Sequence, residues 1–237
     1  MTLFITFLFG LTVFIGTFIV LMIKKSKKIS QLSISIAFSV LFLLIFLELI
    51  PHTLESLNYF EMIIYALVGF LLLKLLDVLI PNHEHSSKGD HSFHIGLMAT
   101  IALIIHNLIE GMILYSSLNS NLNLGILLGI GIGLHNIPMG MIIGSTLRDA
   151  KYEKKNILLT SFLISLSTSI GGFIISLLGS ISEYVIGIMF AITLGMLIYI
   201  VFFELYRHLL HQNKKDNITG LVIGAIIVLI SLLFHSH

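Results

Sequence analysis

Two six-residue motifs combine imidazole, amide and carboxylate side chains within long apolar stretches of the chain. Residues 106–111 read His-Asn-Leu-Ile-Glu-Gly, and residues 135–140 read His-Asn-Ile-Pro-Met-Gly. Residues four positions apart share one face of an α-helix, so His106 and Glu110 lie on the same face. Imidazole nitrogens with carboxylate and amide oxygens form a ligand set that suits Zn²⁺, Fe²⁺, Mn²⁺ or Cd²⁺. The motifs therefore indicate a group of side chains able to bind a divalent metal.

The spacing of the motifs predicts that their histidines lie at one depth. The connection between the two predicted helices is very short, so the helices form an antiparallel hairpin. His106 lies 14 residues before Ser120 and His135 lies 14 residues after Asn121, which places each about 21 Å from the turn. The alternative is that His106 and Glu110 pair only with each other as a structural contact. A second motif at the same depth favours metal binding over that alternative.

The composition of the chain shows which class of protein must position these motifs. Of its 237 residues 57% are hydrophobic and only 11% are charged, whereas soluble domains carry about 25% charged residues. Such a chain cannot cover a water-facing surface or remain disordered, so it is expected to be an integral membrane protein. The absence of cysteine excludes disulfides and thiolate metal sites. A net charge of +1 gives no indication of nucleic-acid binding.

Eight apolar stretches are long enough to cross a membrane as helices. They cover approximately residues 2–23, 30–50, 61–80, 94–117, 122–147, 156–179, 183–206 and 217–234. Membrane strands are excluded because the stretches are long and continuously apolar, and only helices satisfy the backbone in lipid over such lengths. The first stretch lacks the preceding charge and cleavage site of a signal peptide, so we expect it to remain. The sequence thus predicts an all-α protein with a single transmembrane domain over residues 1–237.

The basic residues predict the orientation of these helices. Twelve of the 13 Lys and Arg residues fall in the first, third, fifth and seventh loops. The positive-inside rule places these loops in the cytoplasm and both termini outside, which fits a bacterial cytoplasmic (inner) membrane. The exception is Lys74, which we expect to pair with Asp77 or to reach the cytoplasmic headgroups.

The third loop, about residues 81–93, is rich in histidine. It contains His83, His85 and His91 among polar residues. Several histidines in a short polar loop predict transient metal binding, and the alternative is a plain solvated loop.

The motifs, the eight helices, the termini outside and the histidine-bearing loop together resemble the ZIP family of divalent metal transporters, over essentially the whole chain. The resemblance implies a transport site built by residues of the fourth and fifth predicted helices: His106, Asn107, Glu110, His135 and Asn136. It also makes residues of the second and seventh predicted helices candidates for the ion path: Glu48, His52 and Glu204.

Two departures from the family pattern affect what the resemblance implies. The family carries a metal-bridging Glu at the position of Met139, and its sixth helix carries an acid where residues 165–169 read Ser-Leu-Ser-Thr-Ser. The resemblance therefore implies a single-metal site. The Met139 thioether either fills space, which we favour, or biases the site towards softer metals.

The leading functional hypothesis is transport of a divalent cation into the cytoplasm, with Zn²⁺ favoured and Cd²⁺, Fe²⁺ and Mn²⁺ as alternatives. The metal is then a substrate, and no prosthetic group is expected. Direct ATP drive is not expected because no phosphate-binding Gly-rich loop with Lys is present. One alternative is a metal sensor or partner subunit that no longer transports. An intramembrane metalloenzyme ranks last, because Glu110 would have to serve as both ligand and base. A homodimer is one oligomeric state that the sequence leaves open.

Overall fold

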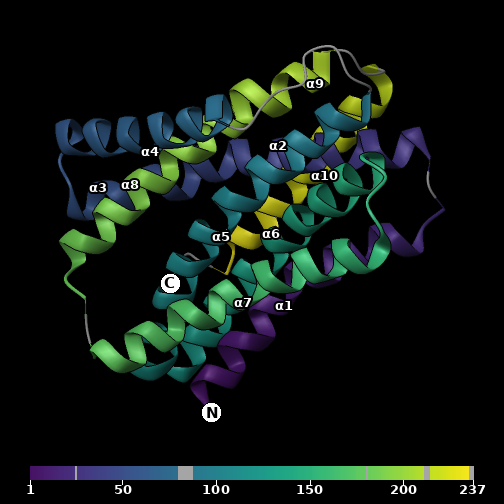
Figure 1. Ribbon diagram of the computed structural model, residues 1–237. Helices are drawn as coiled ribbons and strands as arrows, with labels where there is room; N and C mark the ends of the chain where they lie inside the picture. Colours follow the sequence, from purple (N-terminus) through teal and green to yellow (C-terminus); the bar gives the residue numbers. More distant parts are fainter. Residues whose placement is uncertain (25, 80–87, 180, 211–213, 235–237) are drawn as a thin grey trace.

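The computed structural model describes residues 1–24, 26–79, 88–179, 181–210 and 214–234, with the backbone alone for residues 88–91. Within these ranges the chain forms helices and no strands (Figure 1), which confirms the all-α prediction. The helices are α1 Thr2–Met22, α2 Lys27–Leu44, η1 Ile45–Leu49, α3 Ile50–Ser56, α4 Tyr59–Leu79, α5 Lys88–Ser120, α6 Leu122–Asp149, α7 Lys154–Leu178, α8 Glu183–Tyr199, η2 Ile200–Leu205, α9 Tyr206–Leu210 and α10 Lys214–Leu232.

Eight helical segments of the described residues are long and apolar enough to span a membrane, as the sequence predicted. The second span combines α2, η1 and α3, and the seventh combines α8, η2 and α9. The second span continues to Ser56, beyond its expected end at Ile50, because Pro51 occupies the first turn of α3, where a missing N–H is tolerated. The chain is therefore an integral membrane bundle whose large exposed side chains are suited to lipid contact.

The spans pack in groups around α5 and α6. Helices α1, α5, α6 and α7 contact one another, α2 pairs with α10 against α6, and α4 pairs with α8. Figure 1 shows α4 and α8 side by side on one side of the bundle, with α1 and α7 on the other. The helix pair that carries both sequence motifs therefore lies in the interior of the bundle.

The terminal glycine of each motif is the point where its helix crosses a neighbour. A Cβ atom on Gly111 of α5 would lie 1.8 Å from the Thr168 carbonyl oxygen of α7. A Cβ atom on Gly140 of α6 would lie 1.9 Å from the Val13 carbonyl oxygen of α1. Only glycine permits such close backbone approach, so these residues hold α5 and α6 in place through packing.

Two short π-helical segments interrupt the second and seventh spans. The segments are η1 and η2, and each contains one buried glutamate, Glu48 and Glu204 respectively. A π segment changes the direction in which side chains leave a helix, and such segments are frequent at functional sites. In contrast, α6 continues through Pro138 as one α-helix.

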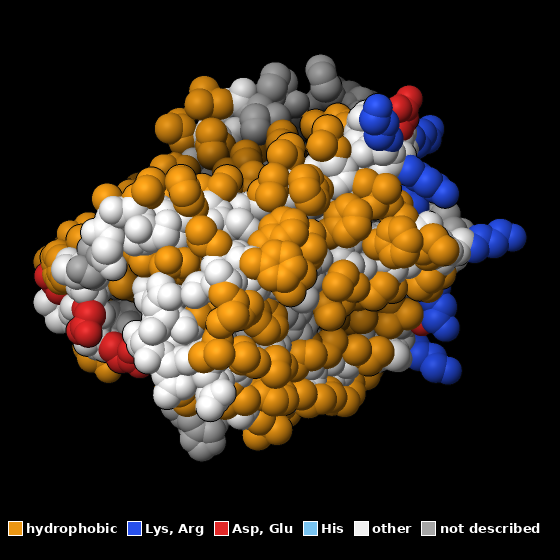
Figure 2. Space-filling view, turned by 90° about the horizontal axis from the view of Figure 1, so that it is seen from below, with side chains coloured by type: hydrophobic (Ala, Val, Ile, Leu, Met, Phe, Trp, Pro, Cys, Tyr) orange, Lys and Arg blue, Asp and Glu red, His pale blue; other side chains and the backbone are white. Residues whose placement is uncertain are grey.

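Two ends of the bundle differ in charge. Figure 2 shows Lys and Arg side chains gathered at one end and acidic side chains at the opposite end. We call the first the basic end, which includes exposed Lys24, Lys28, Lys151 and Lys154. We call the second the acidic end, which includes exposed Glu55 and Glu183.

Candidate metal site

The hairpin of α5 and α6 brings the two motifs together. Asn121 alone separates the helices, and its side-chain oxygen accepts hydrogen bonds from the backbone N–H groups of Asn123 and Leu124. This cap satisfies two donors that the start of α6 would otherwise leave unpaired. The ring centroids of His106 and His135 lie 6.2 Å apart, so the two histidines are close together, as expected from their equal distances from the turn.

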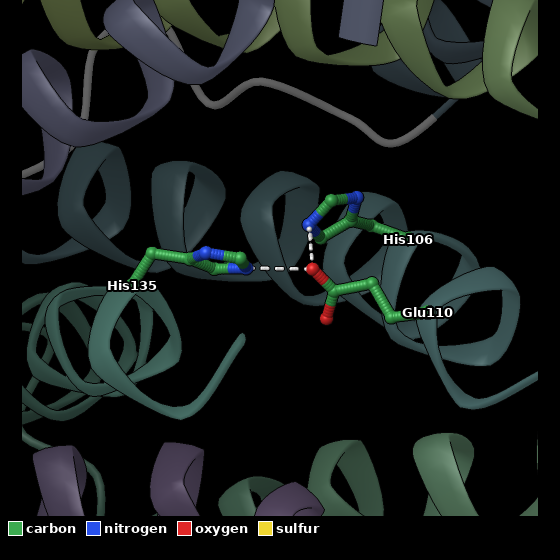
Figure 3. A group of neighbouring side chains, drawn as sticks. All are labelled: His106, Glu110 and His135. Atoms are coloured by element: carbon green, nitrogen blue, oxygen red, sulfur yellow. Dashed lines mark hydrogen bonds and ion pairs between the residues drawn. The ribbon is translucent and has the colours of Figure 1, made fainter. Parts of the chain in front are cut away.

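One carboxylate oxygen of Glu110 lies between two imidazoles (Figure 3). Glu110 Oε1 is 2.6 Å from His135 Nε2 and 3.0 Å from His106 Nε2. Its second oxygen, Oε2, accepts a hydrogen bond of 3.3 Å from the Asn136 side chain. All four side chains are buried, with at most 4% of each residue exposed. A buried carboxylate is costly without partners, and these three partners offset that cost.

This arrangement is close to the geometry of a metal site. Tetrahedral coordination with bonds of about 2.1 Å places neighbouring ligand atoms about 3.4 Å apart. The present separations of 2.6 and 3.0 Å therefore need only small side-chain movements to admit an ion. The ion would lie between the Nε2 atoms of the two histidines and Glu110, so its binding competes with protonation of these ligand atoms.

Asn107 supplies a further indication of a bound ligand. Its side chain is fully buried, and neither its nitrogen nor its oxygen has a hydrogen-bond partner within the part of the chain that the structure describes. Buried amides are normally satisfied, so such a group marks a place for water, an ion or a moving partner. Asn107 follows His106 directly in α5, and its part in the site stays a prediction.

A cavity of about 370 Å³ leads to this group from the acidic end of the bundle. It is lined by Glu48, His52, Glu55, Ser56, His106, Glu110, Ile113, Leu128, Ile132, Glu183, Ile186 and Phe190. Acidic walls raise the local concentration of cations, and low-dielectric surroundings strengthen that effect. Glu48 and His52, predicted as candidates for the ion path, thus line the approach to the site.

The remaining predicted residues lie elsewhere. Met139 is fully buried within the apolar core, which fits the space-filling interpretation. Glu204 is remote from this cavity lining and lies beside Asp77 and His94. The predictions for the third loop fall outside the described part of the chain: His83, His85 and the side chain of His91.

Sequence reasoning missed a second group of ionisable residues. His94 Nε2 lies 2.6 Å from Asp77 Oδ1 and 3.8 Å from Glu204 Oε1. The carboxylate of Asp77, one of the two options that we gave for Lys74, lies against His94 and accepts a hydrogen bond from the Tyr199 hydroxyl. The sequence shows that Asp77 and His94 flank the third loop, but this alone does not predict their contact, because α4 packs mainly against α8.

Comparison with known proteins identifies relatives over nearly the full chain. The family described as ZIP Zinc transporter matches residues 81–232. The chain is 28% identical to the zinc transporter ZupT of Chlorobium luteolum, covering 97% of this chain and 96% of that protein. It is 29% identical to the zinc transporter ZupT of Chlorobaculum parvum, covering 97% of this chain and 95% of that protein.

Proposed function

Because the chain belongs to the ZIP family of zinc transporters, we propose that it carries Zn²⁺ across the membrane through a site formed by His106, Glu110 and His135. Divalent-metal transport follows from the family and from the related zinc transporters, so the protein is a transporter rather than an enzyme. The metal ion is accordingly its substrate. The observation that carries the site assignment is a single buried carboxylate oxygen within 3.0 Å of two imidazole nitrogens.

Transport runs from the acidic end to the basic end, into the cytoplasm. The positive-inside rule assigns the basic end to the cytoplasm, which leaves both termini outside. The cavity reaches His106 and Glu110 from the opposite end, where exposed Glu55 and Glu183 attract cations. This state is open to the outside, and the orientation fits a bacterial cytoplasmic membrane.

The site holds one metal ion at a time. Within the described residues, the group contains one carboxylate and two imidazoles, and the fully buried Met139 occupies the position where the resemblance implies a bridging acid. A divalent ion with one carboxylate leaves a net charge of +1, which is unfavourable in a low dielectric. Binding is therefore weak enough for release, a requirement for transport. Zn²⁺ suits the nitrogen-rich set, and Cd²⁺, Fe²⁺ and Mn²⁺ are competing substrates.

Uptake into proteoliposomes tests this function. Zn²⁺, Cd²⁺, Fe²⁺ and Mn²⁺ are supplied outside vesicles containing wild-type protein, Glu110→Gln or Glu153→Gln. Glu153 is an exposed acid at the basic end whose side chain makes no cap hydrogen bond, so it is a matched control. We expect uptake with the wild type and Glu153→Gln, and background uptake with Glu110→Gln.

The same assay separates transport from the sensor alternative. Wild-type protein that binds Zn²⁺ but shows no uptake would support a sensor or partner subunit. Wild-type uptake that persists in a folded Glu110→Gln variant would contradict the proposed site.

A further inference from the structure

We propose a second divalent-metal site, formed by Asp77 of α4, His94 of α5 and Glu204 of η2, near the basic end of the bundle. The existence of this site does not depend on the transport proposal. Its role, binding transported metal before release, rests on the proposed transport function. Asp77 and His94 lie on consecutive helices, and Glu204 comes from an element much further along the chain. Each offers one ligand atom, and these atoms lie within 4.8 Å of one another.

The geometry resembles that of the central site with the donor types exchanged. His94 Nε2 lies between two carboxylates, 2.6 Å from Asp77 Oδ1 and 3.8 Å from Glu204 Oε1. The His94 and Glu204 side chains are 8% and 9% exposed, and Asp77 is 20% exposed. An ion bound between them needs ligand separations of about 3.4 Å. His94 and Asp77 reach this distance if their side chains move slightly apart.

The charge balance of the group favours a divalent ion. Two carboxylates with one protonated imidazole carry a net charge of −1, whereas two carboxylates, a neutral imidazole and a divalent ion are neutral. The surrounding charges are Arg207, which is exposed and interacts electrostatically with Glu204, and Lys74, which is exposed on α4. Because these cations lie at exposed positions outside the group, they compensate the two carboxylates less than an ion held between them.

The π-helical segment provides a separate observation. The described residues contain two π-helical segments, η1 and η2. Glu48 lies in η1 and Glu204 lies in η2. Each glutamate lies near a histidine of α5: Glu48 lines a cavity with His106, and Glu204 lies 3.8 Å from His94. Since π segments are rare and frequently functional, the repeated pairing indicates that η2 serves to direct Glu204 towards His94.

The position along α5 defines the role of the second site. His94 precedes His106 by 12 residues on the same continuous helix, which corresponds to about 18 Å along the helix axis. The second site therefore lies nearer the basic end. An ion that leaves the central site towards the cytoplasm meets a more oxygen-rich ligand set, one of whose carboxylates, Asp77, is in partial contact with the surroundings.

Equilibrium dialysis of the purified full chain against Zn²⁺ tests the proposal. All proteins carry Ser in place of His83, His85 and His91, so that the third loop does not contribute. We expect about two equivalents bound by this background, and one after adding Glu110→Gln. We also expect one equivalent after adding Asp77→Asn with Glu204→Gln. His94→Gln is a milder second route to the same loss, and monodisperse elution in detergent verifies folding.

The outcomes separate this proposal from the transport proposal. The second site is supported if Glu110→Gln retains one equivalent of Zn²⁺ and loses it when Asp77→Asn and Glu204→Gln are added. This holds whether or not the protein transports metal. No binding by folded Glu110→Gln, or unchanged stoichiometry in both His94→Gln and the double variant, overturns it. Loss of uptake in Glu110→Gln bears on transport alone.

Discussion

Helix α5 contributes to two ionisable groups, the central group of His106, Glu110 and His135 and the second group of Asp77, His94 and Glu204. The two groups use the same donor types in opposite proportions. The central group sets two imidazoles around one carboxylate and is almost completely buried, with Glu110 4% exposed. The second group sets two carboxylates around one imidazole, and its Asp77 is 20% exposed. A divalent ion therefore has a net charge of +1 in the first group and none in the second. We therefore expect the second group, with its additional carboxylate, to hold a divalent cation more strongly than the central group.

The largest contrast is expected between two histidine substitutions. His135→Ala removes one of two nitrogen ligands from the central site, so Zn²⁺ uptake should fall by about 100-fold or more. His94→Ala leaves the central site intact, so uptake should fall by less than about tenfold. Initial rates in proteoliposomes measure both effects. Equal losses in the two variants would remove the functional distinction between the groups.

A substitution at a helix crossing should affect the central site selectively. In Gly111→Ala the new Cβ would lie 1.8 Å from a backbone oxygen of α7, so α7 must move away from α5. We expect a loss of roughly 1–3 kcal/mol in stability, seen as a lower melting temperature in detergent, together with weaker central binding.

A milder substitution controls for added volume. In Gly133→Ala the nearest atom to the new Cβ is the Thr12 methyl carbon at 3.1 Å, which is the end of a side chain. We expect a smaller loss of stability from it. A melting temperature for Gly111→Ala equal to that of the wild type would contradict the assigned packing role.

Acid should weaken the two groups unequally. Metal binding requires neutral imidazoles, so each imidazole ligand adds a competing proton as the pH falls. As the pH falls, the Zn²⁺ affinity of the central site, which has two imidazole ligands, should therefore fall more steeply than that of the second site, which has one. Titrations of Asp77→Asn with Glu204→Gln, and of Glu110→Gln, isolate the two sites, and equal slopes would contradict the ligand assignment.

A smaller effect on Zn²⁺ affinity is expected when the central site is given a second carboxylate, as in the second site. Met139→Glu adds a carboxylate on the helix face of His135, so the Zn²⁺ complex becomes neutral. We expect about tenfold tighter binding, measured by competition titration in the Asp77→Asn, Glu204→Gln background. The metal-free protein should be less stable, because Met139 is fully buried in the apolar core. Unchanged affinity would show that this face does not reach the ion.

The central group was predictable because it depends on local geometry. Helix periodicity places His106 and Glu110 on one face, and equal distances from a short turn place His135 at the same depth. The number of membrane-spanning helices was predictable too, because it depends on the length and composition of the apolar stretches. The role of Gly111 in helix packing was not predicted, since it depends on which helix lies opposite.

The second group was not predictable because it depends on tertiary packing. Asp77, His94 and Glu204 belong to three spans, and Glu204 is directed by a π segment. No periodic pattern in the sequence marks η2, whereas Pro138, the residue most expected to disturb a helix, lies in a continuous α6. Pairing rules within one helix offered Lys74 as a partner for Asp77 and gave no indication of His94.

The most direct test of the central claim is X-ray absorption at the zinc edge. The sample is the Asp77→Asn, Glu204→Gln protein with Ser in place of His83, His85 and His91, loaded with one equivalent of Zn²⁺. We predict nitrogen and oxygen ligands at about 2.0–2.1 Å with the outer-shell scattering of two imidazoles. These would be His106 and His135. A spectrum without imidazole scattering would contradict the account, and so would one with a sulfur ligand, which in this cysteine-free chain would come from a methionine such as Met139.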